Sequence, residues 1–591
     1  MADQAPEVFV LPVKAGVQRD GTSYDSDYYQ DVQWVRFQRS RPKKMGGYRA
    51  VTGVVSGPVR SLLVDSRQGV NSVHTFSKQG VQRLQIDANG SGGAIYDRTP
   101  AGFATGTDYT WSTSLMFSST GGSYTALLAA ATPDLGDIGS DVAGPVYSGD
   151  VTGTGALVPV SETIAAVVTP ITTSGGCVVL QPFLFVYGSN GLIRNSNAND
   201  FSAATGWVTG GSNLANSANP SGTKIVKGLP MRGGTSSPSG LFWSLDSLIR
   251  VVFVGGTTIF RYDTVSASIS VLSKSSIIEY DGLYFWVGVD RFFVYNGVVQ
   301  ELPNQLNSNY FFDNLNFAQR QKVWAMKVPR YGEIWWFYPR GSAATECTDV
   351  IIYNVRDNVW YDNRLARTAG YSSQVFQFPV MAGGEDTMQS TFVIFGSAVG
   401  FFKVGDVVTS TGGATGVVVK ASTTSLNIVN PSALFLNGDV ITNNNGTTAT
   451  INSAPVMQQL DSIWQHEIGH DKVSGQVTSA IRSYFETTNF SYQTGGPTLG
   501  GQSGLNYQSR LVRVEPDFIQ GGTMSLFIMG QKYANSPVVT SVPYLFDSTT
   551  EHLDLREQRR LLALRFESNV IGGYYEGGKI LIAVEPGDVH A

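Results

Sequence analysis

The stretches FVGGTTIFRYD (253–263) and WVGVDRFFVYN (286–296) share one pattern: an apolar or aromatic run, a glycine, a few polar residues and a second apolar run. Aligned on their glycines, they place Phe260 on Phe293, a register of 33 residues. Each stretch predicts a β-hairpin whose glycine serves a tight turn. The pattern also occurs in FSKQGVQRL, VYGSNGLIR and IFGSAVGFFK. Hairpins that recur at several tens of residues, each too small to bury its own face, are typical of a β-propeller; a set of unrelated meander hairpins is the alternative.

The composition favours an all-β protein of several modules. A chain of 591 residues is too long for one compact core unless the architecture is repetitive. Charged residues make up only 15% of it, against about 25% in an average soluble domain, and its 66 glycines suit many short strands and turns. We therefore expect an all-β fold, a β-propeller of about six blades with an inserted small β domain and a peripheral β-rich excursion.

Charge, hydropathy and cysteine spacing argue against a general nucleic-acid-binding protein, a membrane or secreted protein, and a disulfide-stabilised one. A net charge of -5 and a pI near 5.7 argue against a protein whose whole surface binds nucleic acid, because neutralising phosphates needs a basic face. A channel through which DNA slides is a different case, since a lining that does not neutralise phosphates is then an advantage. No apolar run of about 18 residues and no signal-peptide pattern is present, which predicts a soluble protein made in the cytoplasm. Cys177 and Cys347 match no C-x-x-C spacing, so we expect no structural disulfide.

Composition shifts and a second repeat divide the chain into parts. No lysine or arginine occurs between Arg98 and Arg194, which indicates an excursion from the propeller in which SYTALLAAATPD is a candidate short helix. The stretches FKVGDVV and FLNGDVI repeat Phe402 as Phe435, which predicts a small two-fold module inserted into a loop. The predicted parts are an N-terminal docking segment (1–60), the first part of the propeller (61–398, with the excursion at about 99–175), the inserted module (399–455), and the propeller completion with C-terminal strands (456–591).

The stretch SIWQHEIGHDKV (462–473) contains His466, Glu467 and His470 in the spacing H-E-x-x-H. On a helix both histidines lie on one face and bind one Zn²⁺, as in metalloproteases. On a strand they lie about 13 Å apart, too far for one metal. A third ligand is missing, because Gln476 stands where a metzincin has its third histidine. We expect a structural role for these residues, with no metal and no cofactor.

A dense basic stretch lies near the N-terminus. Residues 36–49, RFQRSRPKKMGGYR, carry six basic side chains and no acid, and aromatic residues stand at both ends. Such a stretch is typical of a contact for phosphates or for an acidic protein surface; a solvated strand edge is the plainer alternative. We favour an ordered docking segment, with the candidate residues Trp34, Arg36, Phe37, Arg39, Arg41, Lys43, Lys44 and Tyr48.

Three stretches of the chain resemble the tail nozzle proteins of short-tailed bacteriophages, also called packaged-DNA stabilisation or tail tubular proteins. They are WVRFQRSRPKKMGGYR (34–49), IIEYDGLYFWVGVDRFFVYNGVVQELPN through YGEIWWFYPRG (277–341), and LDLREQRRLLALRFESNVIGGYYEGGKILI (553–582). With the hairpins between them the resemblance covers most of the chain. The excursion and the inserted module depart from it, and none of the three stretches is a catalytic signature.

The resemblance implies a structural virion protein without enzymatic activity. Six copies would form a homohexameric ring below the portal and adaptor rings, at the distal part of a short tail. Its central channel would retain the packaged double-stranded DNA and conduct it during ejection, without reading its sequence, and the adaptor ring and tail fibres or spikes would be partners. The alternatives are a receptor- or carbohydrate-binding tail propeller and, more remotely, a zinc metalloprotease through His466, Glu467 and His470.

Overall fold

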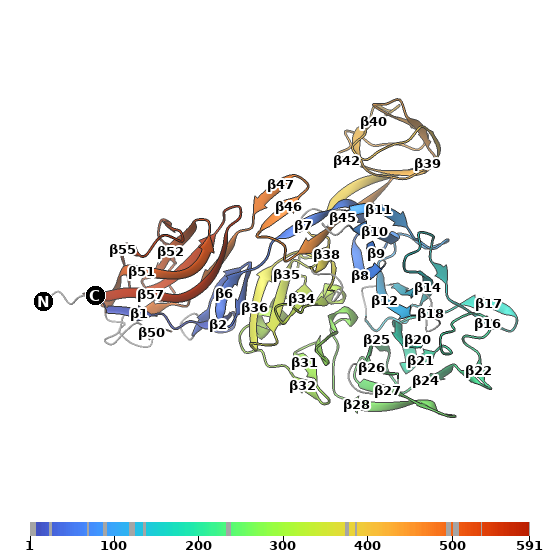
Figure 1. Cartoon of the computed structure of the whole chain (residues 1–591), viewed down its shortest axis with the longest axis horizontal. Helices are drawn as coiled ribbons and strands as arrows, with labels where there is room; N and C mark the ends of the chain where they lie inside the picture. Colours follow the sequence, from blue (N-terminus) through green and yellow to red (C-terminus); the bar gives the residue numbers. More distant parts are fainter. Residues whose placement is uncertain are drawn as a thin grey trace.

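The computed structural model describes the chain except residues 1–6, 23–25, 68–69, 87–91, 118–124, 134–137, 232–237, 373–377, 385–386, 492–497, 500–506, 534 and 590–591. The regular elements of the described residues are almost all β-strands, with a few short helices such as α1 (Ser308–Asn314). Three bodies are visible in Figure 1: a propeller, a β-sandwich that contains the C-terminal strands, and a small barrel that projects from the propeller. Among the described residues, no helix is both long and apolar enough to span a membrane.

Six sheets of four or five strands, together with four strands of a twelve-stranded sheet, make up the seven blades of the propeller in the described part of the chain. Blade one consists of β8 (Val59–Arg67), β9 (Val70–Ser77), β10 (Gly80–Ile86) and β11 (Gly92–Asp97). Blade two consists of β12 (Tyr109–Phe117), β13 (Thr125–Pro133), β14 (Gly144–Asp150), β15 (Val158–Pro159) and β18 (Thr172–Thr173). Blade three consists of β19 (Gly176–Leu180), β20 (Phe183–Tyr187), β21 (Ile193–Asn195) and β24 (Asn216–Ala218). Blade four consists of β25 (Ile225–Pro230), β26 (Ser239–Ser244), β27 (Leu248–Gly255) and β28 (Ile259–Ser266). Blade five consists of β29 (Ile278–Tyr280), β30 (Leu283–Val287), β31 (Phe292–Tyr295) and β32 (Val299–Glu301). Blade six consists of β33 (Trp324–Val328), β34 (Glu333–Tyr338), β35 (Asp349–Asn354) and β36 (Val359–Arg364). Blade seven consists of β37 (Ala369–Tyr371), β38 (Val380–Ala382), β45 (Val456–His466) and β7 (Tyr48–Ser56).

Apolar cores between neighbouring blades close these sheets into a ring. The core between the last and the first blade holds Val55 and Ile463 of blade seven together with Leu62 and Val73 of blade one. First strands of neighbouring blades contact one another, β37 against β8 and β8 against β12, so they line the propeller axis. Because β7 comes from the N-terminal part of the chain, the ring is closed by strands distant in sequence. The predicted all-β propeller is confirmed, with seven blades in the described residues where the sequence indicated about six.

Gly255 and Gly256, with φ of 72° and 66°, serve the predicted turn between β27 and β28, but the repeat register does not mark the blades. Asp281 and Gly282, with φ of 52° and 80°, form the two-residue turn between β29 and β30, as a type I′ hairpin requires. The 33-residue register aligned β27–β28, the third and fourth strands of blade four, with β30–β31, the second and third of blade five. The true equivalents on the second strands are Trp243 and Trp286, whose ring centroids lie 5.8 Å apart across the blade boundary.

Residues 99–175, predicted as an excursion, form the second blade instead. The candidate helix SYTALLAAATPD contributes the buried strand β13, whose Ala and Leu side chains pack on both neighbouring blades. Small side chains let that strand lie between two sheets, so the absence of charged residues from β13 reflects its burial. The hairpin of β16 (Ser161–Ile164) and β17 (Val167–Pro170) leaves this blade at the edge of the propeller (Figure 1).

The inserted module is a closed barrel that interrupts blade seven. Its strands are β39 (Met388–Val399), β40 (Val407–Ser410), β41 (Thr415–Ala421), β42 (Ser425–Val429), β43 (Val440–Asn443) and β44 (Thr448–Ile451), and β42 closes it by pairing with β39. Phe402 and Phe435 of the sequence repeat are both buried in its core. Strand β39 runs unbroken from blade seven into the barrel, so IFGSAVGFFK forms no hairpin and the barrel core already begins at Val393.

Removing the barrel is expected to leave the propeller folded. Phe392 of β39 lies directly opposite Val456 of β45, so an Asn-Gly turn in place of residues 393–455 closes a plain hairpin. We expect the propeller's free energy of unfolding to change by less than about 1 kcal/mol, because an insertion in a surface loop adds little loop-closure entropy. Urea denaturation of the shortened and full-length chains checks this, with an eight-residue Gly-Ser linker as the control for turn strain. Aggregation of both shortened chains would instead show that the barrel is part of the propeller fold.

The C-terminal strands do more than complete the propeller, because after β45 they form a sandwich with N-terminal strands. One antiparallel sheet contains β1 (Glu7–Val10), β5 (Val35–Gln38), β6 (Arg41–Lys44), β51 (Tyr507–Gly521), β55 (Leu553–Arg559) and β57 (Tyr574–Val589). The other contains β4 (Asp31–Gln33), β48 (Ser483–Glu486), β49 (Phe490–Ser491), β50 (Thr498–Leu499), β52 (Met524–Gln531), β53 (Val539–Thr540), β54 (Tyr544–Phe546) and β56 (Leu561–Ser568). The predicted N-terminal docking segment is thus divided between this sandwich and blade seven.

Candidate functional site

The predicted docking segment lies inside the molecule, between propeller and sandwich. Of its eight candidate residues, the buried ones are Trp34, Arg36, Phe37, Lys44 and Tyr48. One continuous apolar core joins Trp34 and Phe37 to Trp335 and Phe337 of blade six and to Phe566 of the sandwich. We call this region the junction. These five residues therefore dock the segment onto the chain's own domains, and the prediction that they contact a partner is wrong because burial removes them from the surface.

Arg36 is the centre of the junction. Its guanidinium donates two hydrogen bonds to Glu333 of β34, at 3.0 and 3.1 Å, and two to Glu467, at 2.7 Å each. The side chains of Arg36 and Glu333 are 1% and 0% exposed. The ring of Tyr331 covers the guanidinium at 3.5 Å. The paired fork geometry on both sides is the strongest form of Arg–carboxylate contact, and it connects strand β5 to blade six and to the turn after β45.

The two carboxylates are held by further donors. Tyr361 Oη donates to Glu333 Oε1 at 2.7 Å and Trp335 Nε1 donates to Oε2 at 2.9 Å. Burial raises the pKa of Glu333, while Arg36 and these donors act in the opposite direction. Glu467 has φ of 63°, in the left-handed region, and a Cβ on Gly46 would lie 2.7 Å from its Cα. A glycine at position 46 is therefore needed for the turn to approach the segment.

The remaining basic residues divide between the sandwich and solvent. Lys44 Nζ donates to the Gly573 carbonyl at 2.8 Å, and burial lowers the pKa of Lys44 to about 8. Lys43 is half-buried and pairs with Glu576 at 3.3 Å. Arg39 and Arg41 are exposed at the β5–β6 turn. Within this segment, the turn is the part whose basic side chains are fully exposed.

The H-E-x-x-H residues do not lie on a helix. His466 is the last residue of β45, and Glu467 follows it in the turn described above. The His466 ring is buried against Tyr48, with centroids 5.0 Å apart, and its Nε2 accepts a hydrogen bond from Arg367 at 3.1 Å. Burial, and secondarily Arg367, holds the pKa of His466 well below its usual range. The Nε2 lone pair thus already accepts a hydrogen bond from the Arg367 guanidinium, so Nε2 is not free to bind Zn²⁺.

His470 lies apart from this arrangement, stacked on Tyr574 of the sandwich with centroids 4.8 Å apart. Within the part of the chain that the structure describes, no three His, Cys, Asp or Glu side chains are grouped so that they could hold a metal ion. The helical interpretation of the motif is wrong, since β-strand pairing extends to Gln465 along β38 and to His466 along β7.

Sequence reasoning missed the acidic partners of Arg36. The signal is the acid in YGEIWWFYPRG, where Glu333 opens a run of aromatic residues that is buried throughout. A carboxylate on a fully buried strand needs a cation, and Arg36 stands in the equally apolar stretch WVRF. Glu467 was singled out as part of a zinc motif, whereas in the structure it accepts hydrogen bonds from Arg36.

Comparisons with known proteins give structures that are similar only in part. No family model matches the sequence, and no curated protein matches it. The extracellular domain of the one-component system BT4673 from B. thetaiotaomicron is 10% identical, with a TM-score of 0.34, and the match covers 74% of this chain and 63% of that one. BamB from Moraxella catarrhalis is 11% identical (TM-score 0.30, 61% and 94% covered), and an exo-beta-1,3-galactanase from Phanerochaete chrysosporium is 10% identical (TM-score 0.24, 91% and 100% covered). Similarities this low carry no argument about function.

Proposed function

We propose that this protein is a structural subunit of a bacteriophage tail nozzle, which assembles into a ring and retains and conducts packaged DNA. The observation that carries the proposal is the junction. The three stretches that resemble tail nozzle proteins, 34–49, 277–341 and 553–582, are far apart in sequence, yet all three contribute side chains to one core. Three stretches of resemblance that pack together in one core are a more specific similarity than three short stretches that lie apart in the fold.

The contacts between the three stretches support this argument. Arg36 of the first binds Glu333 of the second, and Lys43 of the first binds Glu576 of the third. Propeller and sandwich are therefore connected through the buried Arg36–Glu333 ion pair and a continuous apolar core. Such a connection suits a subunit that transmits mechanical load between rings, and a closed propeller leaves few open strand edges.

In this proposal the mechanism is steric and electrostatic, without chemistry at a reacting centre. The net charge of -5 offers little affinity for phosphates that would slow translocating DNA. Homohexamer formation, contacts with an adaptor ring and with fibres or spikes, and a place at the distal end of the tail belong to the same proposal. Immunogold electron microscopy of intact particles tests it: label is expected at the distal tip of a short tail, and label on fibres or on no particle would overturn it.

The exposed β5–β6 turn yields a prediction about assembly. Replacing Arg39 and Arg41 with glutamate is expected to leave the isolated subunit folded, because both side chains are exposed, while reducing its incorporation into particles at least tenfold. Quantitative mass spectrometry of purified particles measures incorporation. The control is the double charge reversal of exposed Lys403 and Lys532, on the barrel and the sandwich. Equal incorporation of both variants would show that the turn does not dock a partner.

A receptor- or carbohydrate-binding tail propeller is the second candidate, since a closed propeller also suits ligand binding. A glycan array with the purified chain separates the two. Specific glycan binding together with label on fibres would favour this candidate over the nozzle.

A further inference from the structure

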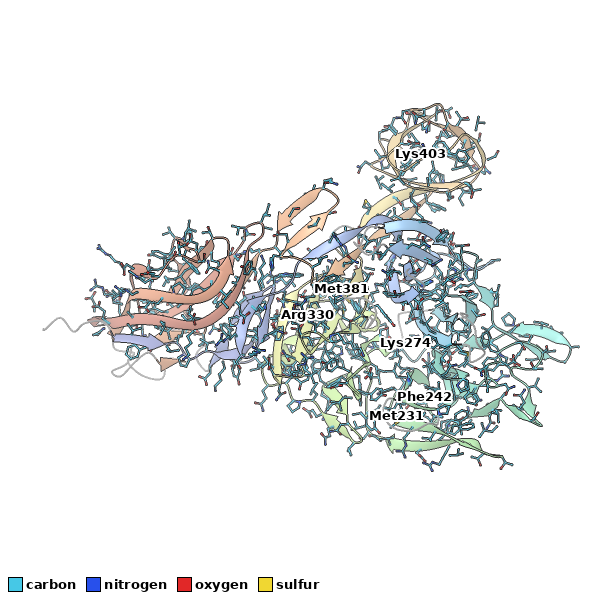
Figure 2. The ribbon with its side chains drawn as sticks, in the orientation of Figure 1. Met231, Phe242, Lys274, Arg330, Met381 and Lys403 are labelled. Atoms are coloured by element: carbon cyan, nitrogen blue, oxygen red, sulfur yellow. The ribbon has the colours of Figure 1, made fainter. Side chains whose placement is uncertain are left out.

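We infer that the hairpin of β16 and β17 is a membrane-contact element, whose apolar tip inserts shallowly into the surface of a lipid bilayer. We call this hairpin, residues 161–170, the edge hairpin. It projects from blade two at the edge of the propeller (Figure 1), and Figure 2 shows its side chains extending outward there. It lies apart from the junction, and the inference does not rest on the tail nozzle proposal.

The edge hairpin is apolar on both faces. Residues 163–168 are all exposed, and Ile164, Val167 and Val168 are 54%, 64% and 62% exposed. Ile164 pairs with Val167, and Thr163 pairs with Val168. Because successive side chains of a strand point to opposite faces, the first pair lies on one face and Val168 on the other. A hairpin that docks on a protein surface needs one apolar face, with water on the other. Apolar side chains on both faces suit a medium that surrounds the hairpin, and the outer acyl layer of a bilayer is such a medium.

The turn of the edge hairpin uses alanine where polar residues or glycine are preferred. Ala165 and Ala166 have φ of 46° and 67°, the left-handed values that a two-residue type I′ turn requires. Such turns strongly prefer Asn-Gly or Asp-Gly, because a left-handed backbone is costly for a residue with a Cβ. The chain uses Asp281-Gly282 in the same kind of turn in blade five. Alanine at both positions keeps the tip free of polar side chains, which would resist burial in lipid.

The base of the edge hairpin is anchored, and the part beyond the base carries no charge. Arg194 of β21 donates hydrogen bonds to both carboxylate oxygens of Glu162, and the centroid of the Trp207 ring lies 5.2 Å from its guanidinium carbon. Residues 163–170 contain no charged side chain. Each strand has four residues, which span about 13 Å at a rise of about 3.3 Å per residue. Interfacial segments enter a bilayer by about 5–10 Å, so the tip reaches the acyl layer while the ion pair stays outside it.

Charge identifies the kind of lipid surface that the edge hairpin matches. Lysine and arginine do not occur between Arg98 and Arg194, whereas acids such as Asp150 and Glu162 lie in that stretch. Attraction to anionic headgroups needs clustered basic side chains. An uncharged tip on an acidic stretch therefore matches a zwitterionic bilayer, such as one of phosphatidylcholine, and its binding depends on apolar burial.

Fluorescence of a label on the tip tests the inference in the full-length chain. Val167→Cys provides an attachment site for the environment-sensitive dye NBD, because the natural cysteines Cys177 and Cys347 are buried. Phosphatidylcholine vesicles are expected to shift the emission to the blue, and lipids with a nitroxide on the upper acyl chain should quench it. Val298→Cys is the matched control, since this valine is 63% exposed in the turn between β31 and β32, and its label should not respond. An equal response at both positions, or none at position 167, would overturn the inference.

Two sets of substitutions separate lipid contact from folding, with vesicle flotation as the measure of binding. Ile164→Asp together with Val167→Asp is expected to weaken binding at least about tenfold, because acidic side chains are costly in the acyl layer. Val298→Asp should bind as the unaltered chain does. Ala165→Asn with Ala166→Gly should also weaken binding, yet leave Tm unchanged or raise it, because Asn-Gly relieves the left-handed alanines. Unchanged binding of either tip variant would contradict insertion of the tip.

Salt and protein concentration provide two readouts that identify the partner. Binding to phosphatidylcholine should change less than about twofold between about 50 and about 500 mM NaCl, and adding anionic phosphatidylglycerol should not strengthen it. Binding that needs anionic lipid and is lost in salt would contradict an apolar contact. A blue shift of the label at position 167 that grows with protein concentration in the absence of vesicles would identify a second copy of the chain as the partner, and it would overturn the inference.

Discussion

Replacing Arg36 with methionine is expected to reduce the stability of the junction by about 3–5 kcal/mol, the cost of breaking a buried ion pair by removing one partner. The change leaves the buried carboxylates of Glu333 and Glu467 without their shared cation. It also removes the guanidinium that Tyr331 covers. Native-state hydrogen exchange of the amides in β5 and β34 measures the local free energy of opening.

A matched control lies three residues away. Arg39→Met removes an exposed arginine from the same segment, and we expect its effect to stay within about 0.5 kcal/mol. Adding Glu333→Gln and Glu467→Gln to Arg36→Met should restore part of the loss, because the carboxylates are then uncharged. If Arg36→Met and Arg39→Met exchange at equal rates, the ion network does not hold the junction together.

The fold class could be predicted from sequence because hairpins carry local signals. Turns such as Asp281-Gly282 and alternating aromatic residues are readable one hairpin at a time. The blade boundaries could not be predicted from sequence. The hairpin of strands two and three in blade five shows the same residue pattern as the hairpin of strands three and four in blade four. Blade two was missed for a related reason: its central strand β13 uses Ala and Leu between two sheets, which looks helical in isolation.

The candidate site shows the same division between local and distant information. The aromatic residues of the basic stretch were expected to anchor it, and Trp34 and Phe37 are buried. What it docks against depends on Glu333 and Glu467, which lie some hundreds of residues away in sequence and meet Arg36 only in the folded chain. Long-range pairs of this kind leave no spacing that one sequence can reveal.

Replacing Trp286 with alanine is expected to destabilise the boundary between blades four and five by about 3–5 kcal/mol, as for a fully buried tryptophan. Trp286 is 0% exposed. Its ring stacks on Phe293 with centroids 5.2 Å apart, and its Nε1 donates to the Ser270 carbonyl at 3.1 Å. The change therefore leaves a cavity and an unpaired carbonyl. Hydrogen exchange of the amides in β26 and β30 measures the loss on both sides of the boundary.

Two comparisons make this prediction specific. Phe317→Ala removes an aromatic ring that is 49% exposed, and surface changes of this kind usually stay within about 0.5 kcal/mol. Trp286→Phe keeps most of the ring contact and should cost less than Trp286→Ala. Because Trp243 of blade four contacts Trp286, the loss must appear in β26 as well as in β30. Faster exchange confined to β30 would mean that neighbouring blades open independently, and the shared cores would not be what holds the ring closed.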